Sequence, residues 1–304
     1  MNKTIQYLAI AFIVQCLILG TVLFGKNSSS LQERSRFLEF DATSIDSLTI
    51  KDAQGELFLK KENGLWLLPD YGNLPIVTGK VEGVLDDLSA LTVSWPIASS
   101  ESAAKRFEVD MDNAQKSIKL KMGNEIIANM YLGTSPGYRK VHARNSDSDD
   151  IYAIEFSQHQ ISNKYEDWFD KGILQYDGEL SKVSVDSLTA IKANDVWSIE
   201  NYQEEVSLSP EKIAAWAKRF NNIQVSKLIE GTDKERVIVM DPVLTVNLEG
   251  NQGSSSLVFF KKDDKTYVKK AGDEALFEIA GFQADPIMNA GITDFQAEDA
   301  TLVN

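Results

Sequence analysis

The segment Gly133-Thr134-Ser135-Pro136-Gly137 fits the pattern G-x-S-x-G, in which an activated serine is the nucleophile of acyl transfer. That chemistry needs a sharp turn from a strand into a helix, an oxyanion-binding loop and a histidine beside the serine. The residues that follow, YRKVHAR, read as a strand, and no glycine-rich oxyanion loop is present. His142 and His159 are the only possible bases, and no spacing places either beside Ser135. We therefore predict a hairpin turn here and no catalytic residues.

The acidic run from Asn145 to Asp150 resembles the start of a calcium-binding loop, with oxygen-bearing side chains at positions 1, 3 and 5. Position 6 is Asp150 instead of the usual glycine, and position 12 is Phe156 instead of the bidentate glutamate. A solvated hairpin tip explains the same residues. The sequence therefore predicts no calcium site.

The residues needed for other kinds of catalytic site are also missing from the sequence. Two histidines and the single Cys16 cannot build a transition-metal site of the usual ligand types. No glycine-rich loop ends in Gly-Lys-Ser or Gly-Lys-Thr, as phosphate binding by a P-loop requires. Neighbouring carboxylates such as Asp86 and Asp87 are typical of a solvated helix surface. We predict a non-enzymatic protein without a cofactor.

Composition and charge limit the class of partner. Of 304 residues, 43% are hydrophobic and 25% charged, which is typical of a folded chain. The formal net charge is −14. Such a surface repels phosphate backbones and anionic headgroups, so nucleic-acid binding and membrane docking by the folded body are both disfavoured.

The strands and helices that the sequence predicts around these turns occur in two similar series, one in each half of the chain. Each copy begins with a β-like run containing Asp-Ser-Leu-Thr and continues with a short run that contains a tryptophan, Trp66 or Trp197. A polar turn, a proline (Pro75 or Pro210) and an amphipathic helix follow, and then a series of alternating strands. Because the order and the spacing are the same in both halves, we predict an internal duplication.

Each copy offers one helix to cover its sheet. The apolar faces are Val77, Val81, Val84, Leu85, Leu88 and Leu91 in the first helix, and Ile213, Trp216, Ala217 and Phe220 in the second. Ser209 followed by Pro210 is a good helix start, with serine as N-cap. A tryptophan at the same place in both copies favours the core over a ligand-stacking role.

The first apolar run, residues 7–24, contains eighteen residues without a charge. As a helix it spans about 27 Å, enough to cross a membrane. A cleaved signal peptide is the alternative, although no small-residue cleavage site follows. Lipidation at Cys16 is disfavoured because Gln15 stands where a small residue is needed. The flanking charges do not decide the orientation.

These elements give an α+β fold: an N-terminal transmembrane helix followed by two tandem repeats of a mainly antiparallel β-sheet module with a covering helix. The predicted boundaries are residues 1–36 for the anchor and linker, 37–177 for the first repeat and 178–304 for the second.

The first copy also resembles a bacterial family, the domain of unknown function numbered 4340. The resemblance is carried by the stretch from Arg106 to Tyr176, and above all by WFDKGILQY at its end, which fits W-x-D-K-x-[LI]-L-x-[FY]. The chain departs from the family at Arg106–Val109, where Tyr-Gly-Leu is more common. The resemblance implies a bacterial inner-membrane protein with one span, its N-terminus inside and its duplicated body in the periplasm. It also implies association with ABC-type transport systems similar to those of gliding motility.

Two functions remain open. The first is a non-catalytic accessory subunit of a transporter complex, with an ABC-type permease and its ATPase as partners. Its small or polar membrane residues Gln15, Cys16, Gly20 and Thr21 would bind the partner helix. The alternative is a periplasmic protein that binds or hydrolyses an envelope polymer in a cleft between the two repeats.

Overall fold

The computed structural model describes residues 12, 14–15, 34–186, 188–203 and 206–297. Within these residues, no helix is long and apolar enough to cross a membrane. Of the predicted anchor, only Phe12, Val14 and Gln15 are described, and these three are helical and exposed. The rest of that prediction lies outside the described residues.

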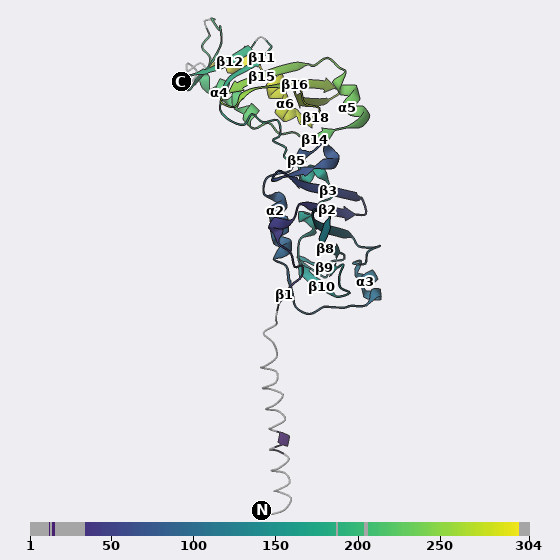
Figure 1. The fold of residues 1–304 in the computed structure, drawn as a ribbon. Helices are drawn as coiled ribbons and strands as arrows, with labels where there is room; N and C mark the ends of the chain where they lie inside the picture. The colour runs from purple at the N-terminus through teal and green to yellow at the C-terminus, as the bar shows by residue number, and fades with distance from the viewer. Residues whose placement is uncertain (1–11, 13, 16–33, 187, 204–205, 298–304) are drawn as a thin grey trace, which may run out of the picture. The chain divides into compact units, whose positions relative to one another are not determined.

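The fold is mixed α+β and is dominated by two eight-stranded antiparallel sheets, which confirms the predicted class. The first sheet has the order β10-β9-β8-β7-β2-β3-β4-β5 (Figure 1). Its strands are β2 (Ser47–Asp52), β3 (Gly55–Glu62), β4 (Leu65–Leu68), β5 (Leu74–Pro75), β7 (Lys116–Met122), β8 (Glu125–Leu132), β9 (Lys140–Asn145) and β10 (Ile151–Glu155). The short strands β1 (Ser35–Arg36) and β6 (Thr92–Val93) form a separate antiparallel pair.

The second sheet has the order β13-β12-β11-β15-β16-β17-β18-β14. Its strands are β11 (Leu180–Val185), β12 (Leu188–Ala193), β13 (Val196–Ile199), β14 (Lys227–Ile229), β15 (Leu244–Gly250), β16 (Gly253–Lys262), β17 (Lys265–Lys270) and β18 (Leu276–Ile279).

Five short helices accompany the sheets: α2 (Lys80–Ser89), α3 (Glu101–Phe107), α4 (Pro210–Ala217), α5 (Gly231–Ile238) and α6 (Gly281–Met288). The 3₁₀ helices in the described residues are η1 (Ala42–Ser44), η2 (Pro69–Tyr71), η3 (Gln158–Gln160), η4 (Tyr165–Asp167), η5 (Lys218–Asn221) and η6 (Ile292–Phe295).

Seven strands follow one another in the same spatial order in both sheets. Read from β10 to β4, the first sheet matches the second read from β18 to β13. The helices agree as well, because α2 and α4 follow the third strand of each copy, and α3 and α5 precede the fourth. This agreement supports the predicted duplication.

Two hairpin loops at the same place in the strand order show how the two copies share local structure. The loop between β3 and β4 is Asn63–Gly64, and the loop between β12 and β13 is Asn194–Asp195. All four residues have positive φ. Two-residue loops with positive φ at both positions are type I′ turns, whose twist matches that of the flanking strands. The same turn type therefore joins the second and third strands of each copy.

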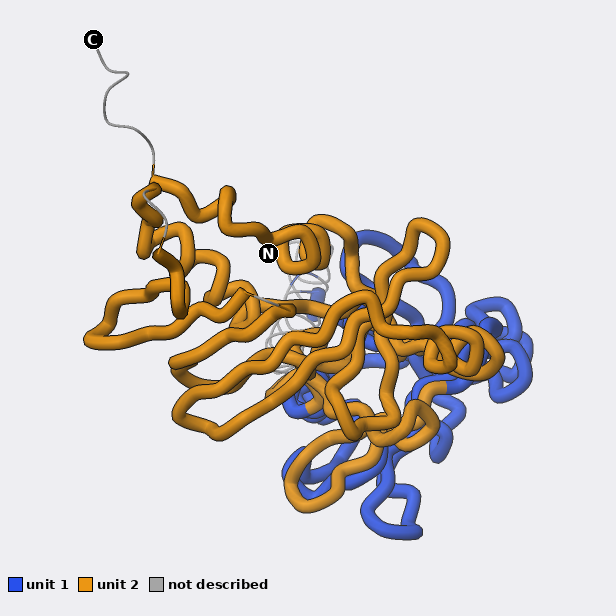
Figure 2. Tube along the Cα trace, turned by 90° about the horizontal axis from the view of Figure 1, so that it is seen from above, with its two compact units in different colours: residues 1–56, 82–161 blue, residues 57–81, 162–304 orange. Residues whose placement is uncertain are grey.

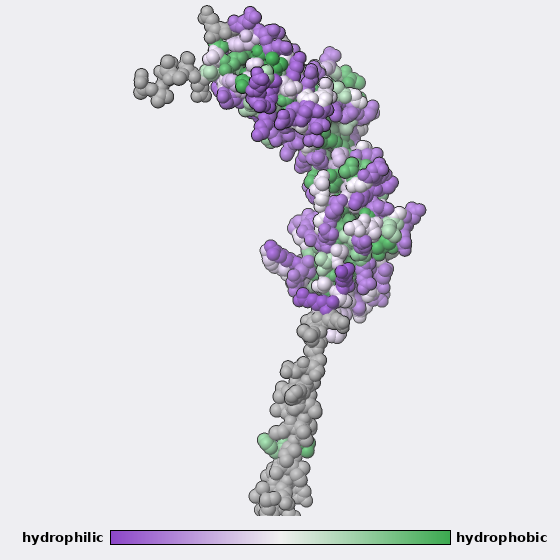
Figure 3. Space-filling model, turned by 60° about the vertical axis from the view of Figure 1, so that its left-hand side comes forward, coloured by the Kyte–Doolittle hydropathy of each residue, from purple (hydrophilic) through white to green (hydrophobic). Residues whose placement is uncertain are grey.

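The chain divides into two compact units (Figure 2). Unit 1 contains residues 1–56 and 82–161, and unit 2 contains residues 57–81 and 162–304. The predicted repeat boundary at residues 177/178 stays a prediction. Hydrophilic side chains cover most of the described surface visible in Figure 3.

The apolar faces of the two predicted helices are buried, with one exception. Helix α2 buries Val81, Val84, Leu85 and Leu88, whose spacing places them on one face. Each such side chain contributes about 1.5–3 kcal/mol when it leaves water. Val77 was placed on this face wrongly: it lies before the helix begins and is 44% exposed.

The second helix and the paired tryptophans agree with the sequence. Ser209 is the N-cap of α4, and its side chain accepts a hydrogen bond from the backbone N–H of Lys212. The apolar residues Ile213, Trp216 and Ala217 are buried, as predicted. Trp66 in β4 and Trp197 in β13 are buried too, so both tryptophans belong to the core.

Candidate functional site

The Gly133–Gly137 segment lies in the turn between β8 and β9, as predicted. The two strands pair antiparallel, so no helix follows the serine. The Ser135 hydroxyl contacts the carbonyl oxygens of Lys140 at 2.6 Å and Gly137 at 2.8 Å. Both acceptors of its single proton are backbone oxygens, whereas a nucleophilic serine gives this proton to a base. Ser135 therefore stabilises the turn.

Gly133 lies where this turn passes the C-terminal end of α3. A Cβ atom at Gly133 would overlap the carbonyl oxygen of Phe107. Two hydrogen bonds fix this approach: the N–H of Gly133 donates to the carbonyl of His142, and the N–H of Thr134 donates to that of Phe107, both at 2.9 Å. The first glycine of the motif is thus required by close backbone packing.

His142 is buried beside this contact. Its Nδ1 lies 2.8 Å from the Thr134 hydroxyl, and its ring lies 4.2 Å from the ring of Phe107. Burial lowers the pKa of His142 below its usual 6.5, and the charge of Arg106 lowers it further, although a backbone hydrogen bond at Thr134 acts in the opposite direction. Within the described residues, no hydrogen bond joins either histidine to Ser135.

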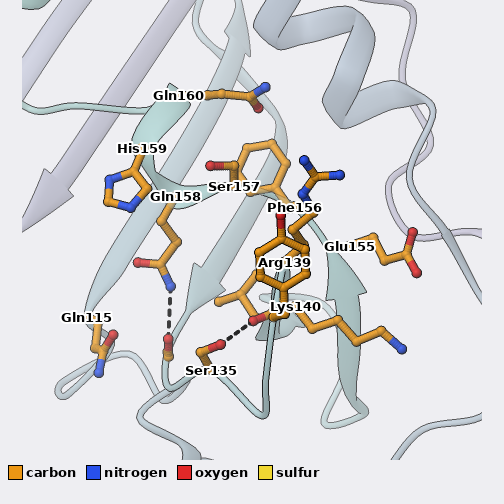
Figure 4. Close-up of a pocket in the computed structure, with 13 residues that line it drawn as sticks. Gln115, Ser135, Arg139, Lys140, Glu155, Phe156, Ser157, Gln158, His159 and Gln160 are labelled. Carbon is orange, nitrogen blue, oxygen red and sulfur yellow. Dashed lines mark hydrogen bonds between the residues drawn. The ribbon is translucent and has the colours of Figure 1, made fainter.

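A groove of about 770 Å³ lies between this turn and the segment that follows β10 (Figure 4). The Gln158 side chain reaches across and donates to the carbonyl of Gly133 at 2.9 Å, which connects the two walls. The other polar and aromatic side chains of the lining are Gln115, Ser135, Tyr138, Arg139, Lys140, Glu155, Phe156, Ser157, His159 and Gln160.

The rim of the groove carries two cations and an aromatic ring. A turn closed by the Lys140 N–H and the Gly137 carbonyl, with Arg139 at φ 56°, presents these side chains. Tyr138 is 85% exposed, and the guanidinium of Arg139 lies 5.1 Å from its ring centre. Among the lining residues, Glu155 is the single carboxylate. The groove is therefore locally positive in a chain of net charge −14.

The chemistry of the lining side chains is suited to binding a ligand. Arginine and lysine bind carboxylate or phosphate oxygens, amides bind hydroxyl and carbonyl groups, and an exposed tyrosine ring stacks on flat or apolar surfaces. In the described part of the chain, no cluster of three or more histidine, cysteine, aspartate or glutamate side chains could hold a metal ion.

The Asn145–Asp150 segment is the tip of the β9–β10 hairpin, as predicted. The N–H of Ser148 donates to the carbonyl of Asn145 at 3.2 Å, and the N–H of Asp147 donates to the Asn145 side chain at 3.3 Å. The Ser148 hydroxyl accepts from the N–H of Asp150. These polar groups shape the turn.

The predicted partner-binding residues belong to the apolar N-terminal run. Gln15 is helical and exposed. Cys16, Gly20 and Thr21 lie outside the described residues, so their role stays a prediction.

The groove was not predicted from the sequence. Its lining comes from Gln115 just before β7, from the β8–β9 turn with the start of β9, and from the end of β10 with the segment after it, which the fold brings together from separate parts of the chain. The one local signal was Tyr138-Arg139-Lys140 directly after Pro-Gly, an aromatic and two bases at a turn.

We expect Gly133→Ala to lower the free energy of unfolding by about 2–3 kcal/mol, because the backbone must move away from α3. Gly137→Ala is the matched control in the same turn, because a Cβ there meets no atom within 4 Å. It should change stability by less than about 0.5 kcal/mol. Urea unfolding followed by tryptophan fluorescence measures both, and equal losses would contradict the packing argument.

A fluorophosphonate probe, which labels activated serines, should leave Ser135 unmodified, because its proton is held by backbone carbonyls. Mass spectrometry of the digested protein gives the readout, with Ser135→Ala as the matched control. Labelling that disappears in the control variant would establish an activated serine and refute this prediction.

His142 should titrate below pH 6.5 in the folded protein. The unfolded chain then binds this proton at a higher pH than the folded chain does. The stabilisation from neutral His142 is therefore complete above pH 6.5 and declines as the pH falls toward the lowered pKa. Imidazole NMR signals, assigned with His142→Gln and His159→Gln, measure the pKa. A value at or above 6.5 would contradict the role of burial.

The family model described as "Domain of unknown function (DUF4340)" matches residues 66–237, more than half of the chain. The match begins in β4, ends in α5 and includes the whole groove. No curated protein and no solved structure matches the chain. The resemblance seen in the first copy is thus confirmed, and the chain belongs to the DUF4340 family.

Proposed function

We propose that this protein is a non-catalytic accessory subunit of a bacterial ABC-type transporter complex. Residues 7–24 anchor it in the inner membrane as a single span with the N-terminus inside. The folded body works in the periplasm, and the partners are the permease and its ATPase. The transporter part extends what the family resemblance implies, since the family description itself names no function.

The hydrogen bonds made by the polar side chains of the groove are the observation that supports a non-catalytic role. The Ser135 hydroxyl and the Gln158 amide are bonded to backbone carbonyls, so they maintain the shape of the groove. Arg139 and Lys140 are exposed at its rim. A groove whose polar side chains are held by backbone carbonyls and whose rim carries exposed charged groups is suited to recognition.

An apolar loop in unit 2 supports a protein partner. It begins at Ile238, the last residue of α5, and exposes Ile238, Val239, Met240 and Val243, of which Val239 is 81% exposed. The preceding residue, Val237, is buried in a cluster with Leu276 and Tyr267, which holds the start of the loop in place. Adjacent exposed aliphatic side chains on a supported loop are typical of protein interaction sites.

Replacing Gly20 and Thr21 together by leucine should reduce the recovery of the permease with this chain. Small and polar residues let transmembrane helices approach closely, and their contacts contribute enough for a roughly 3- to 30-fold change. The measurement is co-purification in mild detergent after expression with the neighbouring permease and ATPase genes.

The matched control exchanges Leu17 and Leu19 for isoleucine, which keeps the length and apolar character of the run. Equal amounts of each variant in the membrane fraction show that insertion is unchanged. A wild-type chain that always purifies without the permease and ATPase would refute the transporter proposal.

A second candidate is a periplasmic protein that binds an envelope polymer, and the groove of unit 1 favours it. Three lining glutamines, Gln115, Gln158 and Gln160, and the exposed Tyr138 ring suit a polyhydroxyl chain. Retention of the purified protein on isolated cell-wall polymer, lost with Tyr138→Ala, would support this candidate. Its hydrolytic form requires the serine labelling described above.

A further inference from the structure

Trp95 is 75% exposed, whereas the other four tryptophans of the chain are buried. It does not lie on a free loop. The N–H of Ile97 donates to the carbonyl of Ile151 at 2.8 Å, and the N–H of Ile151 donates to the carbonyl of Ala98 at 2.8 Å, so the segment is attached to the edge strand β10. An ordered, exposed indole is suited to a surface that is apolar on one side and wet on the other.

Cations from separate segments surround this indole. The pairing of β1 with β6 brings Arg34 beside the segment that leads to Trp95. Arg34, Trp95, Ile97 and Lys140 line one hollow of about 480 Å³, and Glu155 is the single acidic residue of its lining.

The neighbouring groove shares Lys140 and Glu155 with this hollow, so the two are continuous on the surface of unit 1. The groove adds Tyr138 and Arg139 at its rim. We name the combined surface the Trp95 face; it consists of Arg34, Trp95, Ile97, Tyr138, Arg139 and Lys140. Its three cations outnumber the single carboxylate in a chain that is acidic as a whole.

The Trp95 face lies close to the point where the chain leads to the predicted anchor. Strands β1 and β10 lie at the same end of unit 1 in Figure 1. Arg34 stands ten positions after Phe24, the last residue of the apolar run. Even fully extended, ten residues span at most about 35 Å. An anchored chain therefore keeps this face near the bilayer surface.

We propose that the Trp95 face rests on the anionic lipid headgroups of the membrane that holds the anchor. The indole of Trp95 lies at the level of the headgroups, and the cations bind lipid phosphates. Tryptophan and tyrosine prefer this interface, and anionic lipids attract lysine and arginine. The net negative charge of the body then repels the rest of the surface, so contact is confined to this face. This inference rests on the anchor in the proposed function.

The test uses the full chain reconstituted alone in vesicles. One set contains phosphatidylcholine, and a second contains phosphatidylcholine with phosphatidylglycerol at seven to three; both are prepared with and without lipid brominated near the headgroup. The predicted anchor contains no tryptophan, so the difference between wild type and Trp95→Phe isolates the emission of Trp95. We expect this difference spectrum to be quenched by the brominated lipid, and more strongly in the anionic vesicles.

Charge reversal tests the role of the cations. Arg139→Glu with Lys140→Glu should reduce the extra quenching in anionic vesicles by more than about half, since the attraction depends on the basic groups near the surface. Lys51→Glu with Lys119→Glu is the matched control, because it changes the net charge equally on β2 and β7, outside the Trp95 face. The control should retain the quenching of the wild type.

The outcomes separate this inference from the proposed function. A chain that alkaline carbonate releases from membranes has no anchor, which overturns both. A chain that stays in the membrane, but whose Trp95 emission is quenched by soluble iodide and not by brominated lipid, overturns the Trp95 face alone. Equal losses of the extra quenching in both charge-reversal variants would also refute the role of the Trp95 face. The quenching would then depend on the net charge of the chain and not on this surface.

Discussion

Gly133 stands where β8 leaves the first sheet and the backbone passes against the carbonyl end of α3. Its N–H donates to the carbonyl of His142, its carbonyl accepts from Gln158, and the next N–H, that of Thr134, donates to Phe107. Three parts of unit 1 are therefore tied to one residue that cannot carry a side chain. The burial of His142, the shape of the β8–β9 turn and the width of the groove all depend on this contact.

The turn fixed at Gly133, together with the β1–β6 pair, explains how a chain with a negative net charge has a basic patch on its surface. Net charge is a sum over the sequence and does not say where the charges lie. Arg34 arrives through the β1–β6 pair, and Arg139 and Lys140 arrive through a turn that is fixed at Gly133. The expectation that the body avoids anionic surfaces rests on its average charge and does not describe a local patch such as this one.

The sequence predicted elements whose signals are local. Alternating strands, the Ser209 cap and the hairpin turns follow from residue types within a few positions. Val77 was misplaced because Gly79, at φ 77°, precedes the true start of α2. Helices α3 and α5 were missed because they bury only Ala103 and Ala104, and Val237, which gives no clear apolar stripe in the sequence. The groove was missed because no local pattern reports that distant segments meet.

The two copies share their strand order and differ in one connection that matters for function. Between β8 and β9 the chain uses residues 133–139, whereas the equivalent β16–β17 connection is only Asp263–Asp264. A two-residue loop cannot form a groove wall, and it places two carboxylates where the first copy has Arg139 and Lys140. Loops on a common scaffold change more easily than the strands they join. The groove and its basic rim are therefore features of one copy, while the corresponding connection in the other copy is a simple hairpin.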